Sequence, residues 1–203
     1  MRPFRVSVCS CLLAACTTLP PYAVPAPEYP RQGLVAVDID GTLTPRDSAF
    51  LEAREGAAQA LATYVRKGYT IVYLSARVPL LQQGLPDWLR RHEFPDGPLH
   101  VAQSAGDRTQ VDRFKADVLR VYVRRGWRLA FAYGDSSTDF QAYAEAGFRP
   151  EQVYAIRRRS DPNCQPGAYI LCLGGWTEHL PEIERMLAPA CRAEGMGLGS
   201  MDG

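Results

Sequence analysis

An apolar run that ends in two aspartates constrains this chain more than any other stretch. Residues 34–37 are apolar and predict a buried strand, and Asp38, Asp40 and Gly41 follow at its end. Alternation along a strand sends both carboxylates to the same side, and in an open α/β sheet ligands bind at the carboxyl ends of the strands. Adjacent carboxylates repel each other unless a cation or a proton holds them together. The pattern alone fits either a catalytic pair that shares a metal ion or a strand that ends in an acidic turn.

Strand-like and helix-like segments alternate after this first strand. Expected strands cover residues 34–39, 69–74, 99–102, 127–133, 153–156 and 169–173, and expected helices cover residues 50–67, 79–93, 111–125, 138–146 and 177–187. This alternation is typical of a mostly parallel sheet that helices cover on both faces. We therefore expect an α/β fold, a three-layer α/β/α sandwich with a Rossmann-like parallel sheet, over residues 33–192, followed by a flexible tail over residues 193–203.

Further polar side chains lie at the expected strand ends or on the helices that follow. Ser75 ends the second strand, Lys115 lies on the helix near residue 111, and Asp135 and Asp139 follow Gly134 at a strand-to-helix junction. Each residue also has an ordinary structural interpretation: Ser75 as a helix cap, Lys115 as a solvated lysine and Asp139 as an acid favoured in the first helical turn. Their order along the chain decides between these interpretations.

The order of these motifs resembles that of the haloacid dehalogenase superfamily of aspartate-nucleophile phosphotransferases, over roughly residues 33–156. A narrower resemblance is to the catalytic domain of lipin-type phosphatidate phosphatases and, equally, to the related domain of phosphatidylinositol-transfer proteins. It rests on the segments around Asp38, Tyr73–Arg77, Trp88, Gly97, Phe114–Lys115 and Tyr133–Tyr143. The resemblance implies a phosphatase, and the lipid substrate is an expectation from it.

The carboxylates suit in-line phosphoryl transfer. Asp38 would attack phosphorus and form an aspartyl-phosphate, and Asp40 would protonate the leaving oxygen and then activate water. Mg²⁺ favours oxygen ligands and would be held by Asp38, the backbone carbonyl of Asp40 and Asp135. Asp139 would either bind the ion directly or contact the residues that bind it. The sequence therefore predicts a Mg²⁺-dependent phosphomonoester hydrolase.

A second set of residues is expected to bind the phosphoryl group. Ser75, Ala76 and Lys115 would hold its oxygens and offset its charge. Arg77 fits either a phosphate contact or a surface position, and Thr42 would orient the loop that carries the nucleophile.

The spacing of the motifs bears on the substrate. The segments between Asp40 and Ser75 and between Ser75 and Lys115 have room for helices and a short strand, and neither has room for a cap domain. An open site suits a bulky or surface-bound substrate, and we expect phosphatidic acid or a related lipid phosphate. The alternatives are a broad-specificity periplasmic acid phosphatase and a non-catalytic phosphatidate-binding module. Two intact aspartates argue against the binding module.

The N-terminal residues resemble a bacterial lipoprotein leader. Residues 1–15 combine a basic start with an apolar stretch too short to span a bilayer, and Leu13-Ala-Ala-Cys16 is similar to a lipobox. Acylation of Cys16 would anchor the chain, and the alternative is an ordinary secretory signal. Residues 16–32 are proline-rich and predict an extended tether. The expected location is the bacterial cell envelope, as a membrane-anchored lipoprotein facing the periplasm.

Charge and cysteine content add two expectations. The formal net charge of +1 argues against a nucleic-acid partner, although the run of residues 157–159 is a local basic cluster that fits either anionic head groups or a solvated loop. In an oxidising compartment, Cys164, Cys172 and Cys191 include one pair and one cysteine left over. Cys164 and Cys172 flank a segment that can turn, but the sequence leaves the pairing open.

Overall fold

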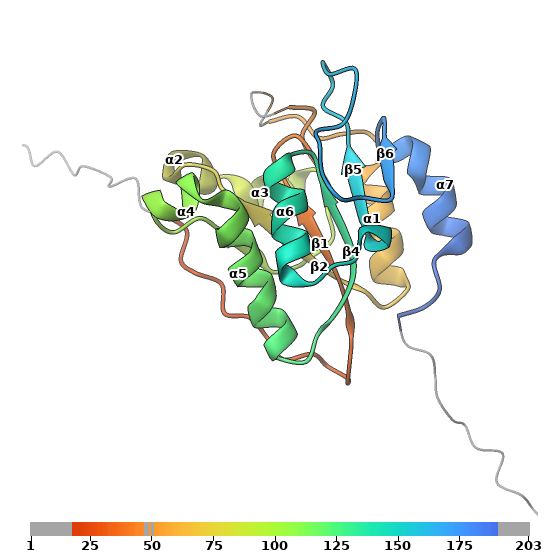
Figure 1. The fold of residues 1–203 in the computed structure, drawn as a ribbon, viewed down its shortest axis with the longest axis horizontal. Coiled ribbons are helices and arrows are strands. Elements are labelled where there is room, and N and C mark those ends of the chain that lie inside the picture. Colours follow the sequence, from red (N-terminus) through yellow and green to blue (C-terminus); the bar gives the residue numbers. More distant parts are fainter. Residues whose placement is uncertain (1–17, 47–48, 50, 191–203) are drawn as a thin grey trace, which may run out of the picture.

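Six parallel strands form one sheet at the centre of the protein (Figure 1). The computed structural model describes residues 18–46, 49 and 51–190. The strands are β1 (Gly33–Asp38), β2 (Thr70–Ser75), β3 (Leu99–Val101), β4 (Arg128–Gly134), β5 (Val153–Ile156) and β6 (Leu171–Leu173), in the spatial order β3-β2-β1-β4-β5-β6. Because every pair is parallel, all six carboxyl ends lie at one edge of the sheet.

Helices cover both faces of the sheet, which confirms the predicted three-layer α/β/α sandwich (Figure 1). Side chains alternate along β1, so that Val35 and Val37 face one core and Leu34 and Ala36 face the other. The first core packs against α1 (Ala57–Arg66), α3 (Leu85–Arg91) and α7 (Trp176–Met186), and the second packs against α5 (Val111–Arg124) and α6 (Ser137–Ala146).

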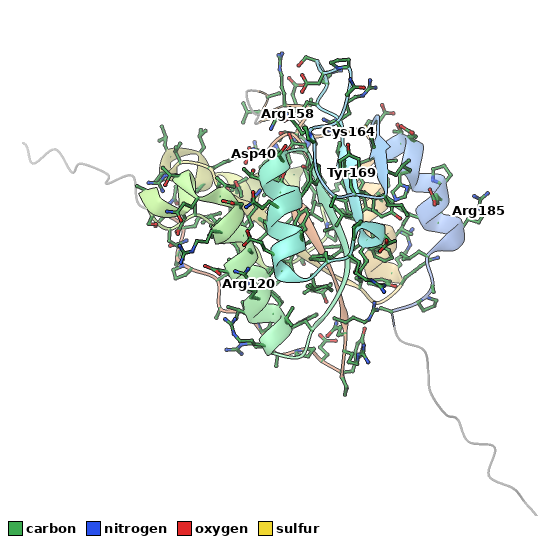
Figure 2. The ribbon with its side chains drawn as sticks, viewed as in Figure 1. Asp40, Arg120, Arg158, Cys164, Tyr169 and Arg185 are labelled. Atoms are coloured by element: carbon green, nitrogen blue, oxygen red, sulfur yellow. A yellow bond between two sulfur atoms is a disulfide. The ribbon has the colours of Figure 1, made fainter. Side chains whose placement is uncertain are left out.

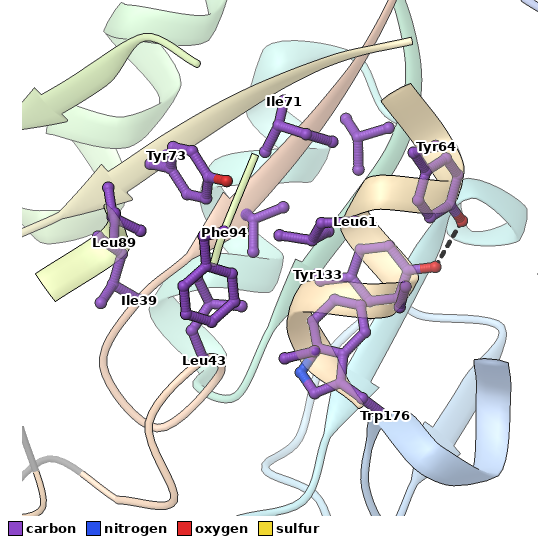
Figure 3. Close-up of a cluster of buried hydrophobic side chains, with 14 of the residues drawn as sticks. Ile39, Leu43, Leu61, Tyr64, Ile71, Tyr73, Leu89, Phe94, Tyr133 and Trp176 are labelled. Atoms are coloured by element: carbon purple, nitrogen blue, oxygen red, sulfur yellow. Dashed lines mark hydrogen bonds between the residues drawn. The ribbon is translucent and has the colours of Figure 1, made fainter. Parts of the chain in front are cut away.

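The first core combines aliphatic side chains with several large aromatic ones (Figure 3). The Tyr133 ring packs against Trp176 with ring centroids 4.5 Å apart, and the Tyr133 and Tyr64 hydroxyls share a 2.6 Å hydrogen bond. This bond gives the buried Tyr64 hydroxyl a partner, and the Tyr133 hydroxyl also contacts His179 Nε2 at 3.1 Å. The bond between the two hydroxyls also links α1 to β4, close to the strand end that carries the candidate site.

Two predicted helices differ from those observed. The helix expected from residue 50 begins at Ala57, because Gly56 has a left-handed φ of 79° at the N-cap. The helix expected over residues 79–93 is divided into α2 (Pro79–Gln82) and α3, since Pro86 cannot donate the backbone hydrogen bond of a continuous helix. The short α4 (Ala105–Thr109) was not expected, although a capping box between Ser104 and Asp107 marks its start.

No inserted domain interrupts the described parts of the fold. The segment from β1 to β2 holds a loop and α1, and the segment from β2 to α5 holds α2, α3, β3 and α4. For the described residues, the predicted absence of a cap domain is therefore confirmed.

The proline-rich N-terminal segment lies against the domain from residue 18 onward. The Trp127 indole donates to the Pro25 carbonyl at 2.8 Å, and the Tyr29 hydroxyl donates to the Gly68 carbonyl at 2.8 Å. The segment is extended as expected, but its described part is packed on the domain and is not a free tether. The leader, Cys16 and the predicted tail lie outside the described residues. Among the residues that are described, no helix is both long and apolar enough to cross a bilayer.

A disulfide joins Cys164, in the segment between β5 and β6, to Cys172 of β6, eight positions later in the sequence. This is the pair that flanks the turn predicted from the sequence. Cys191 lies outside the described residues.

Candidate active site

The predicted site residues lie together at the carboxyl edge of the sheet. Asp38 and Ser75 end β1 and β2, and Asp135 directly follows β4. Figure 2 shows Asp40 and Arg158 close to each other at this end of the molecule. A cavity of about 360 Å³ opens here, and its walls include Asp38, Asp40, Ala76, Arg77, Lys115, Asp135, Asp139 and Arg158.

A buried lysine joins two of the carboxylates. The Lys115 ammonium from α5 donates to Asp38 Oδ1 and to Asp139 Oδ1, each at 2.5 Å. All three side chains are no more than 4% exposed. Lys115 is therefore a site residue and not a solvated lysine of the helix surface.

Burial and mutual repulsion shift the pKa values of this cluster. Burial raises the pKa of the Asp38 carboxyl well above its usual range, and the charge of Asp139 raises it further, while Lys115 opposes the shift. Burial and Asp139 likewise raise the pKa of Asp135 to about 7, against the lowering effect of Arg158. Burial alone would lower the pKa of Lys115, but the charges of Asp139 and Asp38 outweigh it and the pKa is raised. The lysine therefore stays cationic, and the carboxylates need further positive charge to be ionised together.

The acidic cluster fits a divalent cation. One ligand oxygen from each of Asp38, Asp135 and Asp139 lies within 4.8 Å of the other two. In the described structure, Asp38 Oδ2 is buried and has no hydrogen-bond partner. An unpartnered buried carboxylate oxygen is costly, and coordination of a hard cation would satisfy it. The Asp40 carboxylate is not in this group of ligand oxygens and binds Ser75 and Arg77, which leaves its backbone carbonyl as the predicted ligand.

Asp40 has its own set of partners. Its Oδ2 accepts from the Ser75 hydroxyl at 2.9 Å, and its Oδ1 accepts from Arg77 Nε at 2.5 Å. Ser75 is fully buried and positions Asp40 in the described structure, and it is not the cap of α2. Its contact with a phosphoryl oxygen stays a prediction. Arg77 is 8% exposed, which rules out the surface position left open by the sequence, and its Nη2 has no partner among the described residues.

Asp139 combines a structural and a site contact. Its Oδ2 accepts from the backbone N–H groups of Asp135 and Ser136 and from the Ser136 hydroxyl at 2.7 Å, as part of the capping box of α6. Its Oδ1 binds Lys115. Asp139 therefore stabilises the start of α6 with one carboxylate oxygen and contacts the site cluster with the other. Its role toward a metal ion stays a prediction.

A tight turn brings the loop after β1 against Asp135. Gly41 has a φ of 83°, and a Cβ at this position would lie 2.0 Å from Asp135 Oδ2. Thr42 is fully buried, and its hydroxyl faces Asp135 Oδ1 at 3.5 Å. Thr42 does not line the cavity, and its position suits orientation of the loop more than contact with a phosphoryl group.

Three residues near the site were missed in the sequence. The Arg54 guanidinium donates to the Gly41 and Arg157 carbonyls at 2.8 Å, and the Trp176 indole donates to the Thr42 carbonyl at 2.9 Å. Arg158 Nε donates to Asp135 Oδ2. Only Arg158 carried a signal, because it lies in a basic run directly after β5.

Comparisons with known proteins agree with this geometry. The family model described as "PITM 1-3, LNS2 domain" matches residues 35–157. The chain is 28% identical over 159 residues to Protein retinal degeneration B of Drosophila melanogaster, which covers 76% of this chain and 12% of that protein. It is 27% identical over 154 residues to human Membrane-associated phosphatidylinositol transfer protein 2, which covers 74% of this chain and 11% of that protein. The chain thus spans about an eighth of the length of these relatives.

A solved structure is similar in fold. The chain shares 17% sequence identity with one from the structure of the Pnkp1/Rnl/Hen1 RNA repair complex, with a TM-score of 0.54, over 69% of this chain and 46% of that one. The parallel sheet and the strand-end motifs confirm the predicted haloacid dehalogenase-type fold. The family match extends from β1 to the residue after β5 and so includes Asp38, Ser75, Lys115 and Asp135. The chain belongs to the LNS2 domain family, as its resemblance to the phosphatidylinositol-transfer proteins predicted.

Proposed function

We propose that this protein is a Mg²⁺-dependent phosphomonoester hydrolase in which Asp38 is the nucleophile. One observation carries the proposal: the same cavity has a buried acceptor without a partner, Asp38 Oδ2, and a buried donor without a partner, Arg77 Nη2, among the described residues. The first calls for a cation and the second for an anion. A metal ion together with a phosphoryl group meets both needs.

The chemistry divides between the two aspartates of the loop after β1. Asp38 would attack phosphorus, so that a bond forms between its carboxylate oxygen and phosphorus while the bond to the leaving oxygen breaks. Asp40 would give a proton to that oxygen and later take one from the water that hydrolyses the aspartyl-phosphate. Ser75 and Arg77 hold Asp40 in place, and Lys115 holds Asp38.

Asp38, Asp135 and the carbonyl of Asp40 would hold Mg²⁺, with Asp139 beside them. When bound, the ion would neutralise charge on the phosphoryl oxygens and on the carboxylates. Lys115 and Arg77 would add to this neutralisation from the cavity wall.

The substrate we propose is phosphatidic acid or a related lipid phosphate. Membership of the LNS2 family and the membrane-associated relatives support this class. The cavity has no cap over it within the described residues, and apolar side chains of Val78, Leu81 and Val111 form part of its wall. A lipid phosphate has both the charged group and the apolar remainder that such a cavity would contact. A nucleic-acid partner is not part of this proposal.

We further propose that residues 1–15 are a lipoprotein signal peptide and that Cys16 is acylated. The protein would then be a lipoprotein of the bacterial cell envelope, with its domain on the periplasmic side. A lipid anchor of several acyl chains would hold the domain at the membrane that contains the proposed substrate.

Replacing the nucleophile tests the chemistry. Asp38→Asn should lower phosphate release from p-nitrophenyl phosphate at least roughly a thousandfold, because an amide cannot form the acyl-phosphate. The variant should remain folded by circular dichroism, since the substitution removes a buried charge. Asp117→Asn, at an exposed position of α5, is the matched control and should keep full activity. Substantial turnover by folded Asp38→Asn would disprove the assignment.

Metal binding is measurable without turnover. Added Mg²⁺ should raise the thermal midpoint of the protein, because a ligand that binds only the native state stabilises it. Asp135→Asn should diminish this rise, whereas Asp117→Asn should not. Scanning fluorimetry over a MgCl₂ series measures both. An undiminished rise in Asp135→Asn would place the ion elsewhere.

Ca²⁺ should support turnover poorly, because its larger coordination shell misplaces the nucleophile.

Lys115→Met tests the charge balance of the cluster. Removing the ammonium leaves Asp38 and Asp139 buried without their shared cation, and unfolding in urea should show a loss of about 3 kcal/mol without metal. Mg²⁺ should restore more stability to this variant than to the wild type, since the ion supplies the missing charge. Arg113→Met removes an exposed cation of the same helix and should change little. Equal effects of the two substitutions would refute the proposed balance.

The substrate class is tested by a panel of phosphomonoesters. In mixed micelles, the full chain should release phosphate from phosphatidate faster than from glycerol phosphate or nucleotides. If nucleotides or sugar phosphates were hydrolysed much faster than any lipid phosphate, the lipid hypothesis would be wrong. The protein would then be a broad-specificity acid phosphatase. Binding of phosphatidate without any phosphate release would identify a binding module instead.

A further inference from the structure

The described chain begins at the edge of the sheet that holds the cavity. Gln82 of α2 connects the start of the described chain to the loop after β2. Its Oε1 accepts from the Leu19 backbone N–H at 3.2 Å, and its Nε2 donates to the Arg77 carbonyl at 2.6 Å. Gln103, just after β3, donates to the Leu19 carbonyl at 3.1 Å. Figure 1 shows the start of the coloured trace beside α2 and α4. The first described residues therefore lie beside α2, whose Leu81 lines the catalytic cavity.

Apolar side chains are exposed at the same place. Val78 is 49% exposed and Leu80 is 68% exposed, and Leu81 is half-buried beside them. Val78 and Leu81 also line the catalytic cavity, whereas Leu80 does not. These three residues, at the start of α2 and within it, are called the apolar rim below.

We propose that the apolar rim inserts into the surface of a lipid bilayer, so that the catalytic cavity opens onto the head groups. This inference rests on the proposed acylation of Cys16 and deepens the proposed function by assigning the surface that meets the membrane. Cys16 is three positions before Leu19 in the sequence, and an extended chain of three residues reaches at most about 11 Å. An anchor at Cys16 would therefore hold the edge beside α2 against the membrane.

The packed segment determines which part of the domain can reach the bilayer. Its contacts with Gly68 and Trp127 fix its path along the domain, and the contacts of Leu19 with Gln82 and Gln103 fix its described end beside α2. A free tether would let any face of the domain approach the membrane. A segment fixed to the domain would present the apolar rim and the cavity to the membrane together. A phosphate group at the bilayer surface could then enter the uncapped cavity.

A tryptophan placed in the rim reports its environment directly. Leu80→Trp and, as the matched control, Val123→Trp are made in the full chain, which is purified in detergent from membranes and reconstituted into phosphatidylcholine vesicles. Val123 is a 44% exposed apolar residue twelve positions along α5 from Val111, which lines the cavity, and so about 18 Å away. Native Trp88, Trp127 and Trp176 are at most 6% exposed and form a constant background.

In vesicles with brominated acyl chains, the fluorescence of the tryptophan introduced by Leu80→Trp should be mostly quenched. The fluorescence of the tryptophan introduced by Val123→Trp should be unchanged. Equal quenching of both positions, no quenching at position 80, or failure of the chain to enter the vesicles would overturn the proposal. A blue shift at position 80 that bromine does not quench would indicate contact with a second copy and would also overturn it. The vesicles contain no phosphomonoester, so quenching at position 80 would support the rim even if phosphatidate proved not to be hydrolysed.

Discussion

The buried contact of Lys115 with Asp38 and Asp139 is the interaction on which the site depends. Three cationic side chains, Lys115, Arg77 and Arg158, contact four carboxylates at the edge of the sheet, those of Asp38, Asp40, Asp135 and Asp139. With all four ionised, one negative charge is left over, and the buried oxygen without a partner is Asp38 Oδ2. A proton or a metal ion has to supply the missing charge. Burial raises the pKa of Asp38 most, and the negative charges of Asp139, Asp135 and Asp40 raise it further, while Lys115 lowers it.

The fold brings these charges together from distant parts of the sequence. Lys115 lies on α5 and Asp139 on α6, and the two helices pack side by side over one face of the sheet (Figure 1). Asp38 comes from β1 and Asp135 from the end of β4, which neighbours it in the sheet. The parallel register fixes the positions of the strand ends. Lys115 lies on α5, so small shifts of this helix relative to the sheet would break its contacts with Asp38 and Asp139. Core packing therefore determines the electrostatics of the site.

The sequence predicted the parts of this arrangement that depend on local patterns. Asp38, Ser75 and Asp135 follow apolar strands, and parallel strands place such residues at one edge. Arg54 and Trp176 bind carbonyls of the loop after β1, and a backbone carbonyl has no sequence signature that would announce its partner. The path of residues 18–32 was missed for a similar reason. Proline-rich composition predicts an extended chain, but the contacts that hold it to the domain depend on residues as distant as Trp127.

The environments of Asp38 and Asp40 explain how neighbouring carboxylates can have different roles. The Asp38 side chain is 4% exposed and faces Lys115 and two other acids, whereas that of Asp40 is 22% exposed and faces Ser75 and Arg77. A carboxylate held in the charged cluster is suited to attack phosphorus, since its free oxygen has no competing hydrogen bond. A more exposed carboxylate such as Asp40 would be suited to exchange protons with the leaving group and with water in the proposed mechanism. Gly41 makes this division sterically feasible, because the turn it forms lets the loop pass directly against Asp135.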